Sequence, residues 1–554
     1  MSGIVGLRVG RPRARWTLAI SAGVATVCMV AAGCASNPSN PSPRNDGSKS
    51  SGEAVVSIAP GKAAATSPVQ KLTIGYSGPF TSLDPTGGAG GSGYFIMGQL
   101  SLETLLRVTP DGKLQPWLAT SWTQNSPTEY VYTLRQGVKF WDGNELTADD
   151  VVFSLTRNAG TALGKAGFYG SVSKIQARDP HTVVVTLKHP NAAWKNTPGL
   201  AYAQIYQKAF TEAHQDTFGK PGTLVMGTGP WKVNSLDPTK GAEYAANPTY
   251  WGGEPPIKHI TVKFYQSETS LALAMRAGEV DLAPTVGEPD SFKSASGVQV
   301  VTRTTCGSSL FSMPTQTAPW SDVHVRRAVA YALDKQELLK VTGGANIDTL
   351  DTVLAPSLLQ NLGDAGAADA ALKTLPTYPH DMDKAKQEIA QSSRPNGFSA
   401  TMASSNDQAT LKINQAIAAQ LKTIGINLEI KPMPLTAYYA VLRGPADKRP
   451  PLFISTGGCA PDPSWDNIFL GNGGLNLANY HPAEVDTLIA DGLATTDPAK
   501  RLQIYTQILD KLATDLPYIP LFLEGTSYAS NNFEWVNFGD FWAHTCWPLN
   551  IKPR

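Results

Sequence analysis

The sequence lacks a surplus of charge of either sign: 46 Lys and Arg residues stand against 45 Asp and Glu residues in 554, a formal net charge of +1. Binding to nucleic acid needs a basic surplus that neutralises phosphates, so we expect no nucleic-acid partner. Five cysteines are too few for a disulfide-stapled scaffold, and 50 glycines and 41 prolines without a short period exclude a fibrous chain. A globular chain of roughly two to four domains remains.

Signatures of catalysis are lacking too. No two of the eight histidines lie four residues apart, so no helical turn presents two imidazoles to one metal ion. Neither the Gly-x-Ser-x-Gly elbow of hydrolases nor a Gly-Lys-Ser/Thr phosphate loop occurs. We therefore expect no enzyme, no metal site and no cofactor.

The N-terminus has the pattern of a secretory signal peptide. Four arginines between positions 8 and 15 precede an apolar run over 16–30, which is too short for a retained membrane span. AAGC at 31–34 resembles the lipobox of bacterial lipoproteins, although Ala31 stands at the usual Leu position. The resemblance implies a signal over 1–33 and a lipid on Cys34, and two or more acyl chains anchor a protein stably. The alternative is a secreted protein with Cys34 unmodified.

Residues 34–70 are rich in Ser, Pro, Asn, Gly and Ala and show no apolar period, which predicts a flexible tether. Removal of the signal takes four arginines and no acidic residue. The mature chain then holds 42 basic and 45 acidic residues, a net charge of −3.

From Lys71 on, short apolar strands alternate with amphipathic helices. We expect strands at 72–76, 130–134, 182–187 and 426–430, because their apolar residues alternate or are β-branched and aromatic. Apolar residues spaced by three and four predict helices, and their expected beginnings and ends carry capping signals. These helices begin near Thr147, Asp322 and Asp497-Pro498, and another covers 413–424 and ends at Gly425. The order is that of a mixed α/β protein.

Three cysteines remain after Cys34, namely Cys306, Cys459 and Cys546. An odd number allows at most one disulfide within the chain and leaves at least one thiol. Spacing does not choose the pair, and three buried cysteines without a disulfide are an equal alternative.

Five ordered segments resemble the extracytoplasmic solute-binding proteins of ABC importers, in particular the large oligopeptide- and dipeptide-binding family. They are SLDP at 82–85, YTLRQGVKFWDG at 132–143 with LTADDV at 146–151, GTGPW at 227–231 with NPTYW at 247–251, SDVHVRRA at 321–328 with ALD at 332–334, and PYIPL at 517–521. Asp84, Asp142 and Asp149 in these segments have the setting of turn or cap carboxylates rather than of ligand contacts.

The resemblance implies a two-lobed α/β fold of the periplasmic-binding-protein kind (type II), with an extra subdomain in the first lobe and hinge closure on a ligand. The implied parts are lobe I at 71–112, 224–305 and 520–554, the inserted subdomain at 113–223, and lobe II at 306–519. It further implies a monomer on the outer face of the bacterial membrane, with permease subunits and a cytoplasmic ATPase as partners.

The segment that binds ligand in peptide-binding members runs roughly Gly-Trp-x-x-Asp-Tyr-x-Asp-Pro, and its first Asp pairs with the ligand's α-ammonium group. Aligned without gaps on Asp462-Pro463, the corresponding stretch here is 455–463. Thr456 then stands at the Trp position and Cys459 at the anchoring Asp position. Because an unpaired buried ammonium is costly, the usual amine anchor is replaced or absent here.

Three hypotheses follow. The first is a peptide receptor that holds its ligand by backbone hydrogen bonds, with Asp462 or a shifted residue at the ammonium. The second is an importer subunit for a ligand without a free ammonium, such as a modified peptide, an oligosaccharide or a metal chelate. Gly457 and Gly458 would admit such a ligand close to the backbone, and Trp465 would stack on it, unless they are loop glycines and a core Trp. The third is a surface lipoprotein without a transport role.

Overall fold

The computed structural model describes residues 68–78, 80–86, 92–109, 113–161, 168–293, 297–442, 444–455, 462–464, 470–471, 476–536 and 546–554. The chain divides after Ala54, and everything described below belongs to the unit Val55–Arg554.

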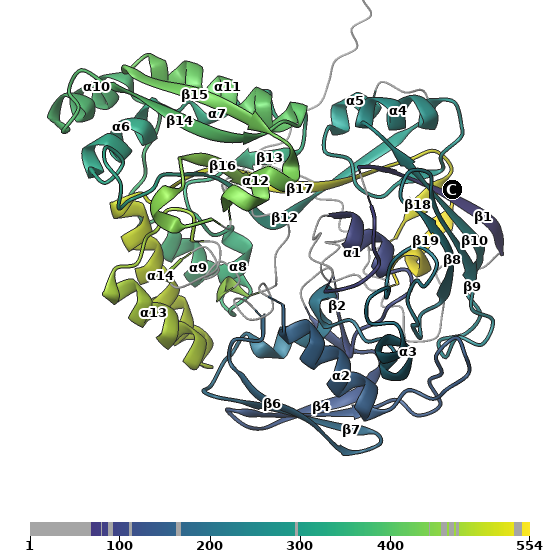
Figure 1. Cartoon of the computed structure of the whole chain (residues 1–554). Coiled ribbons are helices and arrows are strands. Elements are labelled where there is room, and N and C mark those ends of the chain that lie inside the picture. The colour runs from purple at the N-terminus through teal and green to yellow at the C-terminus, as the bar shows by residue number, and fades with distance from the viewer. Residues whose placement is uncertain are drawn as a thin grey trace, which may run out of the picture. The chain divides into compact units, whose positions relative to one another are not determined.

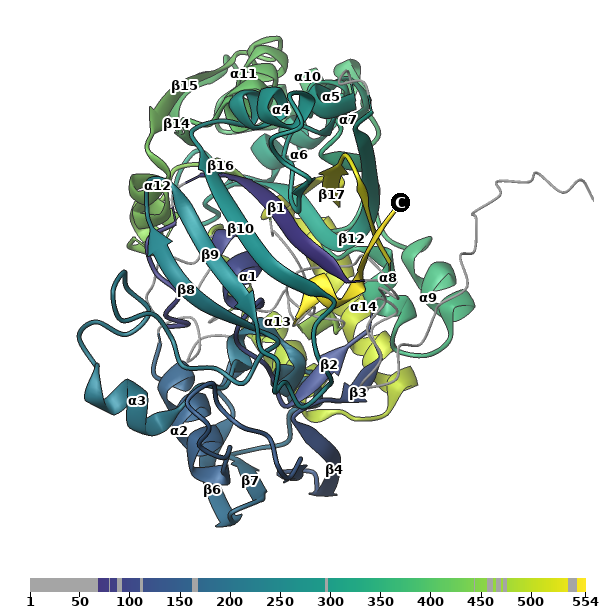
Figure 2. The same cartoon turned by 90° about the vertical axis from the view of Figure 1, so that its right-hand side faces the viewer.

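An 11-stranded mixed sheet runs through this unit (Figures 1 and 2). Its strands lie in the order β15-β14-β16-β12-β17-β11-β1-β10-β9-β8, and β13 pairs with β17 beside this path. The bounds are β1 Val69–Ser77, β8 Trp231–Asp237, β9 Gly241–Ala246, β10 Ile257–Tyr265, β11 Leu282–Ala283, β12 Gln299–Ser312, β13 Asn346–Thr349, β14 Phe398–Ser405, β15 Ile426–Met433, β16 Leu452–Ser455 and β17 Tyr518–Ser530.

The first lobe is built on β1, β8, β9, β10 and β11. Strand β1 runs parallel to β10, and Leu72 and Ile74 of β1 are fully buried beside Ile260. The helices α1 (Ser92–Gly98), α4 (Glu268–Arg276) and α5 (Pro289–Lys293) belong to this lobe, and α4 packs against β1 and β10. The short pair β18 (Phe533–Trp535) with β19 (Ile551–Pro553) also belongs to it, and the pair β2 (Leu106–Val108) with β3 (Leu114–Pro116) lies at its border with residues 113–223.

A four-stranded antiparallel sheet forms within residues 113–223, which we call the insert. Its order is β4-β5-β7-β6, with bounds β4 Ala119–Ser126, β5 Glu129–Leu134, β6 Val172–Asp179 and β7 Thr182–Leu187. The helix α2 (Ala148–Ala159) packs against β6 and β7 through its buried Val151 and Leu155. Thr147 and Asp150 form the capping box at its start, since the Thr147 amide and hydroxyl both donate to the Asp150 carboxylate.

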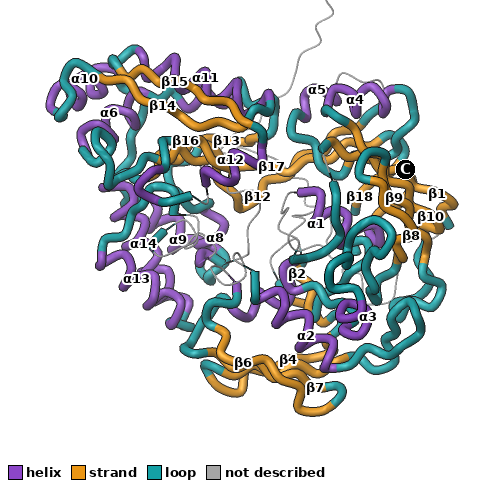
Figure 3. Tube along the Cα trace, in the orientation of Figure 1, coloured by secondary structure: helices purple, strands orange, loops and turns teal. Residues whose placement is uncertain are grey.

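The second lobe combines β14, β15 and β16 with most of the helices (Figure 3). The remaining helices are α3 Lys208–Ala213 in the insert and, in the second lobe, α6 Val323–Ala332, α7 Lys335–Lys340, α8 Pro356–Gln360, α9 Ala365–Leu372, α10 Met382–Gln391, α11 Gln408–Lys422, α12 Leu435–Leu442, α13 Ala483–Ala494 and α14 Pro498–Asp515. In α11, the fully or almost fully buried Ile413, Ile417 and Leu421 form the predicted apolar face.

The long strands β12 and β17 join the two lobes (Figure 1). One end of this antiparallel pair borders β11 in the first lobe, and the other end borders β16 in the second. Register shifts interrupt the pairing between Thr304 and Ser308 and again between Ser309 and Leu310. The expected lobe boundary at 305/306 therefore falls on the first irregularity, whereas the expected boundary at 519/520 falls inside β17.

The predicted strands at 72–76, 130–134, 182–187 and 426–430 are confirmed as β1, β5, β7 and β15. The predicted helix starts are confirmed too, because Asp322 and Asp497 accept hydrogen bonds from amides of the first turns of α6 and α14. Helix α14 ends at Asp515, and Leu516 adopts a left-handed conformation as its C-cap before Pro517.

Candidate functional site

The segment that the resemblance assigns to ligand binding follows strand β16. This strand pairs antiparallel with β12, and its last residue, Ser455, lies opposite Ser309. Of the candidate ligand-binding residues, Gly457, Gly458, Cys459 and Trp465 lie outside the described residues, as does the candidate lipid site Cys34. Asp462 is described, and so are the strands from which the segment departs.

Asp462 is held by Arg501 of α14. Its two carboxylate oxygens accept hydrogen bonds of 2.7 and 2.8 Å from the guanidinium, and the side chains are 4% and 3% exposed. The Arg501 Nε atom donates to the carbonyl of Gly492, and the Ser464 hydroxyl and amide donate to Asp462. Burial raises the pKa of Asp462, but the hydrogen bonds and charge of Arg501 outweigh it and lower the pKa below its ordinary value.

This pairing bears on the first hypothesis. An ammonium group at Asp462 would share a carboxylate whose two oxygens already face one guanidinium in a buried fork. The geometry gives Asp462 a structural task, which is to fasten the end of the ligand segment to α14. A contact with ligand stays a prediction.

The cysteines take different states. Cys306, on β12, is disulfide-bonded, while Cys546 is a fully buried thiol that forms no disulfide. The partner of Cys306 is therefore a cysteine outside the described residues. One disulfide and one leftover thiol agree with the parity argument from the sequence.

A group of polar side chains lies where the ligand segment begins. We call it the junction cluster, and it consists of Thr305, Ser309, Asn346 and Glu524. Glu524 is 7% exposed, and its Oε1 accepts a hydrogen bond of 3.0 Å from the Ser309 hydroxyl. Ser309 also lies 3.3 Å from Oδ1 of Asn346, and the Thr305 hydroxyl donates to the Glu524 carbonyl. The sequence analysis did not identify this cluster. The one local sign of it is an acidic residue, Glu524, among the mainly apolar and small residues of β17.

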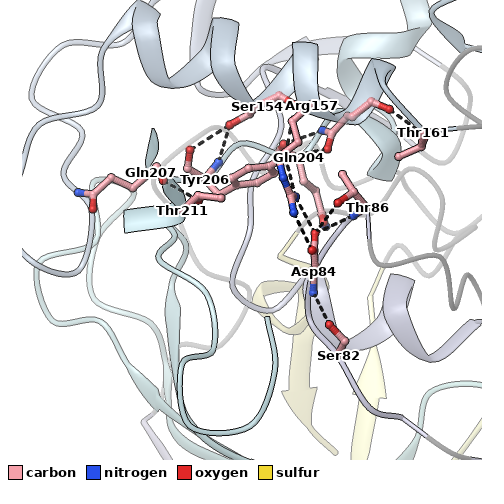
Figure 4. A network of polar contacts seen from close by, with 11 residues as sticks. Ser82, Asp84, Thr86, Ser154, Arg157, Thr161, Gln204, Tyr206, Gln207 and Thr211 are labelled. Carbon is pink, nitrogen blue, oxygen red and sulfur yellow. Dashed lines mark hydrogen bonds and ion pairs between the residues drawn. The ribbon is translucent and has the colours of Figure 1, made fainter. Parts of the chain in front are cut away.

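Asp84 of the SLDP segment has a structural role. Figure 4 shows its carboxylate facing Arg157 of α2, which donates two hydrogen bonds of 2.7 Å to it. Burial lowers the pKa of Arg157, but the hydrogen bonds from its side chain to Asp84 reverse this and leave it raised. The guanidinium also lies over the rings of Tyr206 and Phe218. The pair therefore ties the insert to the first lobe.

The other motif carboxylates are turn and cap residues. Asp142 accepts hydrogen bonds from Asn144 and from the side chain of Gln207. Asp149 lies in the first turn of α2, where Asp150 rather than Asp149 completes the capping box. The expectation that these groups hold the fold is confirmed for Asp142, and Asp149 places a negative charge near the positive end of the α2 dipole.

The side chain of Glu103 is the common hydrogen-bond partner of two further segments, 227–231 and 247–251. It is completely buried, and its carboxylate accepts hydrogen bonds of 2.6 to 3.2 Å from Trp117, Thr228, Tyr250 and Trp251. Burial raises the pKa of Glu103, although these hydrogen bonds oppose it. The segments 227–231 and 247–251 thus converge on one buried carboxylate, which nothing in the local sequence pattern had indicated.

Other features of the described part of the chain do not add a site. It holds no group of three or more potential metal-ligating side chains and no helix with the length and apolarity of a membrane span. A small hollow in the second lobe is lined in part by Lys335, Tyr378 and Leu512. None of the candidate ligand-binding residues lines it.

Comparison with known proteins gives consistent matches. The family model "Bacterial extracellular solute-binding proteins, family 5 Middle" matches residues 113–473. The glutathione-binding protein GsiB of Escherichia coli O1:K1 is 26% identical over 490 residues, which cover 85% of this chain and 92% of that protein.

Solved structures match over most of their length. The periplasmic binding protein DppA from Helicobacter pylori, in complex with the peptide STSA, has a TM-score of 0.76 at 22% identity and covers 88% of this chain and 98% of its own. AgaA from A. tumefaciens R10, in complex with agropinic acid, has a TM-score of 0.74 at 23% identity and covers 87% and 99%. The predicted two-lobed α/β fold of periplasmic binding proteins is thereby confirmed.

Proposed function

Because the chain belongs to the bacterial extracellular solute-binding proteins of family 5, we propose that it is a binding subunit of an ABC importer that captures peptides outside the membrane. It delivers them unchanged to permease subunits, and a cytoplasmic ATPase supplies the energy. The observation that carries the proposal is the match over 85% of this chain and 92% of GsiB, with both lobes present.

Peptides are the ligand class that the similar proteins favour. DppA is described with the peptide STSA and GsiB as glutathione-binding, and glutathione is itself a short modified peptide. A peptide between two lobes finds backbone partners on either side, since strand edges and glycines present unshielded amide and carbonyl groups. The proposed contact residues are Gly457, Gly458, Cys459, Asp462 and Trp465.

A second candidate is an importer subunit with a non-peptide ligand. Two observations favour it: Cys459 stands at the aligned position of the ammonium-binding Asp, and AgaA is described with agropinic acid. In both cases the protein is a monomer that we place at the outer face of the membrane through a lipid on Cys34.

Native mass spectrometry of residues 71–554, purified from the producing cells without refolding, separates the two candidates. A ladder of co-purified peptide masses supports the first, whereas a single non-peptide mass overturns it in favour of the second. No co-purified ligand, together with no thermal shift against peptides, sugars and chelates, would overturn the binding function itself.

The anchor has a separate test. Wild type grown with a labelled fatty acid should incorporate the label, and Cys34→Ser in the full chain should not. Equal incorporation into this variant would contradict lipidation at Cys34.

A further inference from the structure

A backbone hydrogen bond joins the insert to the second lobe. The amide of Ala192 donates to the carbonyl of Leu493 at a distance of 2.8 Å, and we call this bond the latch. Ala192 is 8% exposed, so water has little access to the latch from the side of the insert. The two residues lie on different lobes, and the bond is therefore lost whenever the insert and α13 move apart.

The acceptor of the latch lies in the last turn of α13. The last carbonyl groups of a helix have no partner within the helix and need donors from elsewhere. The carbonyl of Gly492 accepts a hydrogen bond of 3.0 Å from Nε of Arg501, which belongs to the same lobe. The next carbonyl, that of Leu493, accepts from Ala192 of the insert. Neighbouring carbonyls at the negative end of the α13 dipole thus take one donor from each lobe.

Arg501 holds this turn of α13 in place. Its planar guanidinium donates two hydrogen bonds to Asp462 and one to the Gly492 carbonyl, so the pairing with Asp462 fixes the direction of the third bond. A Cβ atom on Gly492 would lie 3.2 Å from the ring of Tyr505, which shows how closely α13 approaches α14 here. The position of the Leu493 carbonyl is therefore set by the packing of the second lobe alone.

The donor of the latch lies in a turn that is also held in place. The side-chain oxygen of Asn191 accepts a hydrogen bond of 3.0 Å from the Ala193 amide, and its Nδ2 donates to the Ser171 hydroxyl at 2.9 Å. The Trp194 amide donates to the Asn191 carbonyl, and the Trp194 side chain is 1% exposed. Ala192 therefore lies between anchored residues of the insert, while its own amide donates to the other lobe.

We propose that the latch favours contact between the insert and the second lobe before any ligand is bound, and that Arg501 is its positioning residue. The proposal goes beyond the proposed function and does not depend on it. Arg501 keeps the end of α13 in place when the lobes separate, so the latch re-forms without a rearrangement of the helix. One backbone hydrogen bond shifts the balance between joined and separated lobes by about two- to tenfold, which biases the lobes without locking them.

The test is hydrogen–deuterium exchange of the full chain without added ligand, resolved to single amides by mass spectrometry. In wild type, the Ala192 amide should exchange at least about twofold more slowly than an unprotected amide in the same sequence context. Arg501→Met removes the donor to the Gly492 carbonyl but leaves the insert unchanged. It should raise the exchange rate of the Ala192 amide by about twofold or more, because the acceptor is no longer held in position.

Two controls separate the latch from general stability. The amides of Val183, Val184 and Val185 in the buried strand β7 of the insert should keep their wild-type rates in Arg501→Met. Glu484→Gln alters an exposed pair with Lys511 that also joins α13 to α14, and its Ala192 amide should exchange as in wild type.

The double variant Asp462→Asn with Arg501→Met covers the case in which Arg501→Met does not fold. It leaves no buried charge unpaired, yet it still lacks the donor to Gly492, so the Ala192 amide should exchange faster in this variant too.

An Ala192 amide that exchanges in wild type as an unprotected amide does would overturn the proposal. An unchanged rate at Ala192 in the folded Arg501 variants would also overturn it. So would equal acceleration at Ala192 and in β7, since that result gives Arg501 a general effect on stability. No ligand takes part in this experiment, so these outcomes leave the proposed peptide function standing, and a failed search for a ligand leaves the latch standing.

Discussion

Replacement of Asp462 by Asn tests whether the carboxylate of Asp462 stabilises the fold or binds the ligand. The side chains of Asp462 and Arg501 are 4% and 3% exposed and share two hydrogen bonds of 2.7 and 2.8 Å. Loss of one member leaves the other charge buried and unpaired, which costs about 3–5 kcal/mol. We expect Asp462→Asn and Arg501→Met each to lower the free energy of unfolding by that amount in urea denaturation.

The double variant should lose less than the sum of the single losses, with a coupling energy of at least about 1 kcal/mol, because neither charge is then left alone. Glu484→Gln is the matched control. Its carboxylate pairs with Lys511 at 3.1 Å, but the two side chains are 64% and 34% exposed, so we expect no measurable change.

The stability that Asp462 contributes should depend on pH in a direction that its lowered pKa fixes. Since the pKa of Asp462 is lowered in the folded protein, its contribution to stability is present above the ordinary Asp value of about 3.9 and is lost as the pH falls through the folded value. The difference in free energy of unfolding between wild type and Asp462→Asn should therefore become smaller as the pH falls below about 3.9. An Asp462→Asn variant that unfolds at the wild-type urea concentration yet loses its ligand would refute the structural role.

Four further outcomes are expected. Asp84→Asn removes the negative charge that pairs with Arg157, and the Asp84 side chain is only 13% exposed, so this change should lower the free energy of unfolding by about 2–4 kcal/mol in urea denaturation. An unchanged midpoint would contradict the role of this pair in joining the insert to the first lobe. Because burial raises the pKa of Glu103 in the folded protein, its contribution to stability falls as the pH rises above the ordinary value of about 4.3. The difference in free energy of unfolding between wild type and Glu103→Gln, measured by urea denaturation, should therefore shrink as the pH rises from that value, and a constant difference would contradict the raised pKa. Cys546 forms no disulfide, Cys28 lies in the signal that we expect to be removed, and we expect Cys34 to carry a lipid, so mass mapping of non-reduced peptides should find Cys306 joined to Cys459. Recovery of Cys306 and Cys459 in separate peptides would contradict this pairing. Ala192→Pro removes the backbone N–H of the insert that donates a hydrogen bond of 2.8 Å to the Leu493 carbonyl of the second lobe. Small-angle scattering should therefore give a larger radius of gyration for this variant than for Ala192→Gly, which keeps the N–H. Equal radii would show that the hydrogen bond does not help to hold the lobes together.

Local sequence patterns were sufficient for the regular elements. Alternation predicted β1 and β15, and the spacing of Ile413, Ile417 and Leu421 predicted α11, because these patterns arise from burial of one face. The motif carboxylate Asp84 was correctly assigned to the fold. Its actual partner, Arg157, lies 73 residues away in the insert, and no local pattern encodes a distance of that kind.

The candidate site was less predictable for the same reason. Asp462 was singled out by alignment to a ligand-binding segment, whereas its pairing with Arg501 depends on how α14 packs in the second lobe. Glu103 and Glu524 became visible only with the fold, because burial of an acidic side chain depends on elements that are far apart in the sequence. In β17, the acidic residue within an apolar strand was the one local sign.

The continuous sheet limits how the two lobes can move. Because β12 and β17 remain hydrogen-bonded to both halves, sliding of one lobe past the other would break the ladder along its whole length. Bending at residues 305–307 breaks few additional hydrogen bonds, since the pairing is already interrupted there. We therefore expect the lobes to turn about residues 305–307, which lie opposite Glu524 on β17, so that the β12–β17 pairing on either side of this point is kept during the motion.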